Sequence, residues 1–67
     1  MIIHSSAVIH PAAELAQGVE VGPFTTLGPN VRIGEGTVIG PNVLIEAGTV
    51  IGKNCKILHG ASLGGEP

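Results

Sequence analysis

Three histidines, one cysteine and five glutamates are the side chains of this 67-residue chain that could act as bases, nucleophiles or metal ligands. An imidazole can act as a general base or bind a metal ion, which makes His4, His10 and His59 the first candidates. His4 and His10 directly follow aliphatic residues near the amino terminus, whereas His59 precedes Gly60 far along the chain. Whether any of them can act together depends on the fold that positions them.

Neither the cysteine nor the glutamates form a catalytic pattern. A thiol reacts where it is accessible and a positive environment favours the thiolate, but Cys55 occupies a position that elsewhere in the chain holds small residues. We therefore expect Cys55 to be buried as a compact apolar side chain. No two glutamates are placed for acid and base roles. We expect solvated surface positions for Glu14, Glu20, Glu35, Glu46 and Glu66.

An aliphatic residue recurs at every sixth position along the whole chain. The series comprises Ile3, Ile9, Leu15, Val21, Leu27, Ile33, Ile39, Ile45, Ile51, Ile57 and Leu63. Such a short period, with Gly and Pro in fixed phase, is typical of the hexapeptide parallel β-helix, in which each repeat is one short strand and one turn. The fold class that we predict is all-β: a single-stranded parallel β-helix built from hexapeptide repeats.

A small or β-branched residue four positions after each aliphatic one points to the same side of its strand, because side chains alternate along a strand. Together these two sets of positions, the aliphatic and the small residues, define the interior of the predicted helix. Three repeats close one triangular coil of about eighteen residues, so residues eighteen apart should stack at roughly 4.8 Å. The predicted interior ladders are Ile3, Val21, Ile39 and Ile57; Ile9, Leu27, Ile45 and Leu63; and Leu15, Ile33 and Ile51.

The residue pairs between strands have the composition of type II turns. Pro presets the first central residue, and Gly or Asn tolerates the positive φ of the second. Phe24 alone departs from this rule. The pairs are Gln17-Gly18, Pro23-Phe24, Pro29-Asn30, Glu35-Gly36, Pro41-Asn42, Ala47-Gly48, Lys53-Asn54 and His59-Gly60.

Composition excludes several functional classes. The formal net charge is −2, three residues are basic and Phe24 is the sole aromatic, so the chain has neither a phosphate-binding patch nor a stacking platform for nucleic acid. We expect no nucleic-acid partner. No apolar run is long enough to span a bilayer, and a single cysteine forms no internal disulfide. These features favour a cytoplasmic protein without a transmembrane segment.

The predicted fold separates the histidines. His4 and His10 fall in an outward phase on two different walls of the first coil, where an exposed polar side chain is expected. They do not converge, so we assign no catalytic residue and no metal ligand. His59 lies at a corner, where neighbouring subunits of such prisms can meet, and is the one candidate for substrate binding. Glycine strings such as Gly34-Glu35-Gly36 are structural, because no helix follows them to receive a phosphate.

Four strings carry a family resemblance: Ile9-His10-Pro11, Val21-Gly22-Pro23-Phe24, the run from Gly28 to Val38, and the run from Ala61 to Pro67. The chain closely resembles the amino-terminal coils of the bacterial acyl-acyl carrier protein:UDP-N-acetylglucosamine O-acyltransferases. The resemblance implies a left-handed coil and a homotrimer with active sites between subunits. It also implies transfer of a 3-hydroxyacyl group from acyl carrier protein to the 3-hydroxyl of UDP-N-acetylglucosamine, the first step of lipid A biosynthesis, without a metal or cofactor. Thr25 stands where many relatives have Cys, a change within the small interior phase.

In that family the histidine general base and the charged substrate-binding residues lie beyond the segment that resembles Ala61 to Pro67. We therefore expect residues 1–67 to be the amino-terminal scaffold segment of a longer domain, inactive in isolation. Alternatives are a sugar acetyltransferase using acetyl-coenzyme A, a γ-class carbonic anhydrase and a non-catalytic ice-binding or assembly module. The carbonic anhydrase needs three converging histidines, and an ice-binding surface needs a uniform outward threonine ladder, which the sequence lacks.

Overall fold

The computed structural model describes residues 1–64, and every regular element in this range is a two-residue strand. Each strand consists of one outward-phase residue and the aliphatic ladder residue that follows it. The strands are Ile2–Ile3 (β1), Val8–Ile9 (β2), Glu14–Leu15 (β3), Glu20–Val21 (β4), Thr26–Leu27 (β5), Arg32–Ile33 (β6), Val38–Ile39 (β7), Leu44–Ile45 (β8), Val50–Ile51 (β9), Lys56–Ile57 (β10) and Ser62–Leu63 (β11).

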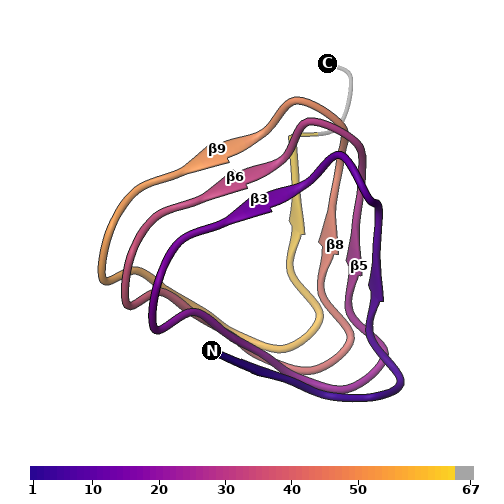
Figure 1. Cartoon of the computed structure of the whole chain (residues 1–67). Coiled ribbons are helices and arrows are strands. Elements are labelled where there is room, and N and C mark those ends of the chain that lie inside the picture. The colour runs from indigo at the N-terminus through magenta and orange to yellow at the C-terminus, as the bar shows by residue number, and fades with distance from the viewer. Residues whose placement is uncertain (65–67) are drawn as a thin grey trace.

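The strands form three parallel sheets, which are the walls of a triangular prism (Figure 1). Wall A has the order β1-β4-β7-β10, wall B has the order β11-β8-β5-β2, and wall C has the order β3-β6-β9. Paired residues are eighteen apart in every wall, as in Ile3↔Val21 and Leu15↔Ile33. The predicted coil length and all three ladders are therefore confirmed.

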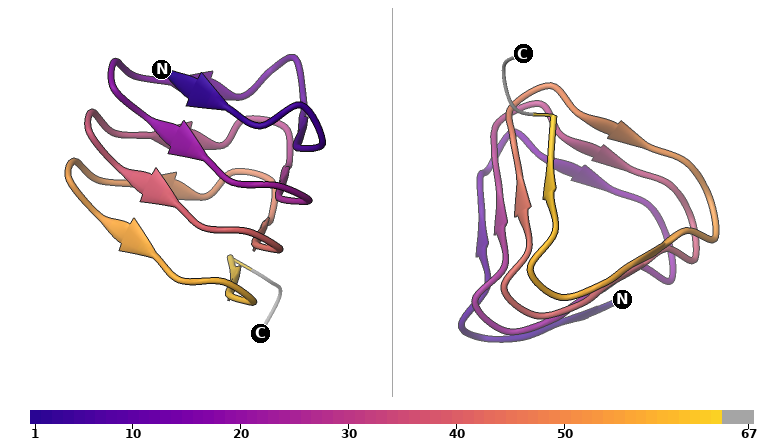
Figure 2. Two further views of the ribbon diagram at one scale, coloured as in Figure 1. Left: turned by 90° about the horizontal axis from the view of Figure 1, so that it is seen from below. Right: turned by 180° about the vertical axis from the view of Figure 1, so that it is seen from behind.

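Consecutive coils stack on one another along each wall (Figure 2), and backbone hydrogen bonds join them. For example, the Val8 N–H donates to the Thr25 carbonyl at 2.8 Å, and the His10 N–H donates to the Leu27 carbonyl at 3.0 Å. These bonds satisfy the polar backbone groups of strands that bury one face. Within residues 1–64, the strands of the first coil and the last strand of each wall pair on one side only.

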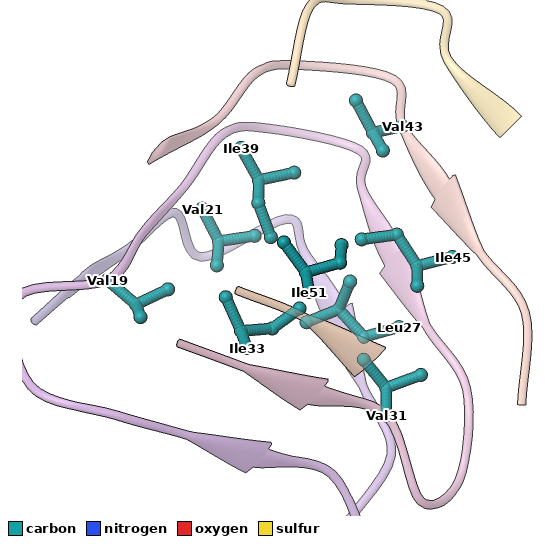
Figure 3. Packing of buried hydrophobic residues seen from close by; sticks show 9 residues of the cluster. All are labelled: Val19, Val21, Leu27, Val31, Ile33, Ile39, Val43, Ile45 and Ile51. Carbon is teal, nitrogen blue, oxygen red and sulfur yellow. The ribbon is translucent and has the colours of Figure 1, made fainter. Parts of the chain in front are cut away.

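The core combines ladder residues of the middle coils with three valines of the small interior positions, Val19, Val31 and Val43 (Figure 3). Leu27, Ile39 and Ile45 are at most 1% exposed. Burial falls toward the ends of the prism, and Ile3, which we predicted to be interior, is 42% exposed. Its backbone pairs with the ladder as predicted, but none of the described residues stacks on its outer side.

The small interior positions contain a second buried feature, a pair of threonine hydroxyls that bridge coils. Thr25 Oγ1 donates to the Gly40 carbonyl at 2.7 Å and accepts from the Val43 N–H at 3.2 Å. Thr37 Oγ1 makes the equivalent bonds to Gly52 and Cys55. Both hydroxyls are thus buried without an unmet hydrogen bond.

Cys55 occupies the predicted interior phase, but it is exposed, which corrects our expectation of burial. Its N–H donates to Thr37 Oγ1 in the preceding coil, so its backbone is in the expected place. The thiol is open because none of the described residues stacks over it.

All eight predicted turn pairs have a positive φ at their second residue, including Phe24 at 58°. The turn assignment is therefore confirmed even where the residue type argues against it. The turns at Ser5-Ser6 and Pro11-Ala12 differ, since Ser6 and Ala12 do not have positive φ. A search of residues 1–64 found no helix long and apolar enough to cross a membrane.

Candidate functional site

The structure keeps the three histidines apart. His4 and His10 lie at the ends of β1 and β2, on walls A and B of the first coil, whereas His59 lies in the turn after β10. His4 and His59 share the corner between walls A and B, but three coil spacings, roughly 14 Å, separate them along the prism. Among residues 1–64 no group of three or more His, Cys, Asp or Glu side chains could hold a metal ion.

His4 and His10 have a structural role that the sequence analysis missed. Each accepts a hydrogen bond through Nδ1 from the backbone N–H two residues later, at 3.1 Å from Ser6 and 3.0 Å from Ala12. This is the bond that an Asn or Asp side chain makes in an Asx-turn. Both histidines occupy the first position of a four-residue turn, and that placement is the sequence signal that could have identified the role.

The His4 turn is also connected to the next coil. Ser6 Oγ lies 2.8 Å from His4 Nδ1 and accepts a hydrogen bond from the Phe24 N–H at 3.1 Å. The Asn42 N–H in turn donates to the Pro23 carbonyl at 2.9 Å. Three successive turns of the A–B corner are thereby tied together, and the backbone at Phe24 is held from both sides.

Replacing His10 by Ala should destabilise the first coil by about 1 kcal/mol, because the Ala12 N–H loses its acceptor. The matched variant is His10→Asn, whose side-chain oxygen can accept the same bond. Hydrogen exchange at the Ala12 amide measures the effect locally. Equal protection of this amide in wild type and His10→Ala would contradict the assignment.

His59, the predicted substrate-binding residue, is exposed at the A–B corner. The next residue, Gly60, donates its N–H to the Pro41 carbonyl at 3.4 Å, which stacks this turn on the one before it. The imidazole of His59 is accessible to a ligand or a neighbouring subunit. The assignment of substrate binding stays a prediction.

An open groove of about 340 Å³ runs over the outer face of wall A next to this corner. Ile2 and Val38 contribute apolar side chains, Pro23 lies on the corner side, and His4 and Glu20 add polar groups. Gly22 also lines the groove. A Cβ at Gly22 would lie 2.7 Å from the Gly40 carbonyl carbon, so the close approach of the two coils requires glycine there.

The acidic residues are distributed as surface groups. Glu14 and Arg32 form an exposed ion pair on wall C, with 3.6 Å between Glu14 Oε2 and Arg32 Nε. Such exposed pairs contribute at most about 1 kcal/mol. Glu20 and Glu35 are exposed, and Glu46 is half-buried rather than fully solvated. Glu66 lies outside the described residues.

The stacked three-walled coils, with positive φ at turns spaced six residues apart, define a hexapeptide-repeat β-helix. The sequence model described as bacterial transferase hexapeptide (six repeats) matches residues 13–47 and 30–65, and the chain belongs to this family.

Two relatives are known acyltransferases. The crystal structure of UDP-N-acetylglucosamine O-acyltransferase (LpxA) from Moraxella catarrhalis RH4 is similar over 100% of this chain and 26% of its own, with a TM-score of 0.96 and 37% identity. The acyl-[acyl-carrier-protein]--UDP-N-acetylglucosamine O-acyltransferase of Trichlorobacter lovleyi is 67% identical over 24 residues, 36% of this chain and 9% of that protein. The predicted left-handed parallel β-helix is confirmed by this likeness. The chain spans about a quarter of the length of the solved relative.

Proposed function

We propose that residues 1–67 are the amino-terminal scaffold segment of an acyltransferase that moves a 3-hydroxyacyl group from acyl carrier protein to the 3-hydroxyl of UDP-N-acetylglucosamine. The observation that carries the proposal is the likeness of the whole chain to the Moraxella enzyme, at 37% identity and a TM-score of 0.96. The short match to the Trichlorobacter enzyme, whose name states the same activity, supports it. The whole protein would catalyse the first step of lipid A biosynthesis in the cytoplasm, as a homotrimer.

The chemistry defines what the rest of the protein must supply. In the reaction the carbon–sulfur bond of the thioester breaks and a carbon–oxygen ester bond to the sugar forms. A base takes the proton of the sugar hydroxyl, the leaving thiolate receives a proton, and hydrogen-bond donors stabilise the oxyanion of the intermediate. We place these groups on coils after residue 67, so the isolated chain should show no transfer.

Within the described coils, His59 is the residue that we propose to contact substrate. It is exposed on the fourth coil, the end of the prism nearest to the coils that would follow. An imidazole there can hydrogen-bond a sugar hydroxyl or a phosphate oxygen. Its role would be binding rather than proton transfer.

A chimera tests the scaffold role. Residues 1–67 would replace the corresponding segment of the Moraxella enzyme, and transfer from 3-hydroxyacyl carrier protein to UDP-N-acetylglucosamine would be assayed. We expect kcat within about tenfold of the parent enzyme and no use of acetyl-coenzyme A. A folded chimera without transferase activity would contradict the proposal.

The same chimera tests His59. His59→Ala should raise KM for UDP-N-acetylglucosamine several-fold and leave kcat nearly unchanged. The reason is that the substrate and the transition state lose the same interaction. The matched control is Lys53→Ala, at the position equivalent to His59 in the preceding turn, on a different corner. An unchanged KM in His59→Ala would remove this residue from the substrate site.

A further inference from the structure

Phe24 is the one positive-φ residue of the predicted turns whose residue type the turn does not favour. The seven other positive-φ positions of the predicted turns hold Gly or Asn, yet Phe24 adopts a φ of 58° and leaves its side chain 69% exposed. The left-handed conformation costs a non-glycine residue about 1–2 kcal/mol. Burial of the ring within the described chain does little to offset that cost, and such an outlier points to a contact outside the chain.

We propose that the Phe24 ring inserts into the wall A groove of a second copy of this chain. The inference rests on the homotrimer proposed above for the number of copies, and it adds the surface and the anchoring residue. An aromatic ring entering an apolar groove is the kind of contact that dominates protein interfaces. The groove supplies Ile2, Pro23 and Val38 for the ring to pack against.

The positions of ring and groove suit copies arranged around an axis parallel to the prism. Phe24 belongs to the second coil, and the groove extends from Ile2 in the first coil to Val38 in the third, centred on Glu20 and Gly22. Ring and groove therefore lie at the same height, as rotation about a parallel axis requires. A contact that joins two different patches can close into a ring of copies.

The backbone presents the ring rigidly. The Phe24 N–H is held by Ser6 Oγ at 3.1 Å, and the preceding carbonyl, of Pro23, accepts from Asn42 at 2.9 Å. Little backbone entropy therefore remains to be lost when the ring docks. Phe24 is thus a preorganised anchor.

The neighbouring surfaces are compatible with a second copy. Phe24 lies in the turn just before wall B, and the outward side chains of wall B are uncharged. Wall A carries the outward charges Glu20 and Lys56. Wall B of one copy can therefore pack on wall A of the next without bringing like charges together. The outward residues of wall B are Val8, Thr26, Leu44 and Ser62. The chain exposes 4072 Å², and the roughly 800 Å² that each partner buries in a standard interface is about a fifth of that area.

The decisive variant is Phe24→Asn, analysed by sedimentation equilibrium and thermal melting at micromolar concentration. Asn is the residue that the equivalent turns hold at Asn30 and Asn42, so the folded monomer should be as stable as wild type or more stable. Self-association should weaken at least tenfold. A variant that is at least as stable as wild type but associates more weakly identifies Phe24 as a contact residue. A structural residue would lower the stability as well.

Groove variants complete the test. Val38→Lys should weaken association as Phe24→Asn does, whereas Val50→Lys, an outward valine on wall C that is 70% exposed, should leave it unchanged. Because the chain has no Trp or Tyr, the emission of Phe24→Trp reports on this site alone and should shift to the blue as copies associate. Wild-type association that persists in Phe24→Asn would overturn the inference and leave the homotrimer standing. A wild-type chain that stays monomeric would overturn both, while the acyltransferase proposal would still be judged by the chimera.

Discussion

Replacing Ile39 by Asp should unfold the chain. Ile39 is 1% exposed and lies between Val21 and Ile57 in the wall A ladder. An unpaired carboxylate at this position has no partner inside the prism, and burying it costs several kcal/mol. That cost is a large part of the stability of a small domain. Circular dichroism and chemical denaturation measure the loss directly.

The control for this variant is Glu20→Asp, in the outward phase of the adjacent strand. Glu20 is exposed, so the change should alter the free energy of unfolding by less than about 0.5 kcal/mol. Equal effects at the two positions would mean that the inward and outward phases have been assigned wrongly.

Gly34→Ala should be nearly as damaging, although it adds a single methyl group. A Cβ at Gly34 would lie 2.5 Å from the Gly52 carbonyl carbon and 2.6 Å from its oxygen. Both are backbone atoms of the next coil, so no side chain can move aside, and the two coils must separate along wall C. We expect a loss of about 3 kcal/mol in the free energy of unfolding, at the upper end of overpacking effects.

Gly52→Ala is the matched control, because it repeats the change one coil later. No atom lies within 4 Å of a Cβ at Gly52, and its φ is not in the left-handed region. The variant should be neutral or stabilised by up to about 1 kcal/mol, since Ala restricts the unfolded chain more than Gly does. Similar melting temperatures for the two alanine variants would show that the coils are not in the close contact described here.

The sequence predicted the fold because its period acts at every level of structure. The same six-residue spacing sets which side chains face inward, where the turns occur and which residues pair eighteen positions apart. Phe24 shows how strong this constraint is, since its φ follows the repeat against its own preference. Local propensity at one residue is small compared with the pairing of the coils on either side.

The six-residue period could not predict how far residues at the ends of the prism are buried, nor the side-chain contacts of the candidate site. Ile3 and Cys55 have the interior phase, but their exposure depends on whether another coil covers them. The turn contacts of His4 and His10 depend on side-chain orientation, which a period of six does not specify. The groove on wall A also escaped prediction, because its lining combines apolar and polar residues from three coils that carry no sequence motif.

The uniform spacing of the pairing between coils has a consequence for how such a chain folds. Every strand pairs with one eighteen residues away, so the entropy lost in closing each coil is the same however long the solenoid becomes. The solenoid can therefore grow one coil at a time, each new coil pairing with the coil already formed. A nascent chain can lay down a new coil each time about eighteen more residues leave the ribosome, without waiting for distant segments to appear.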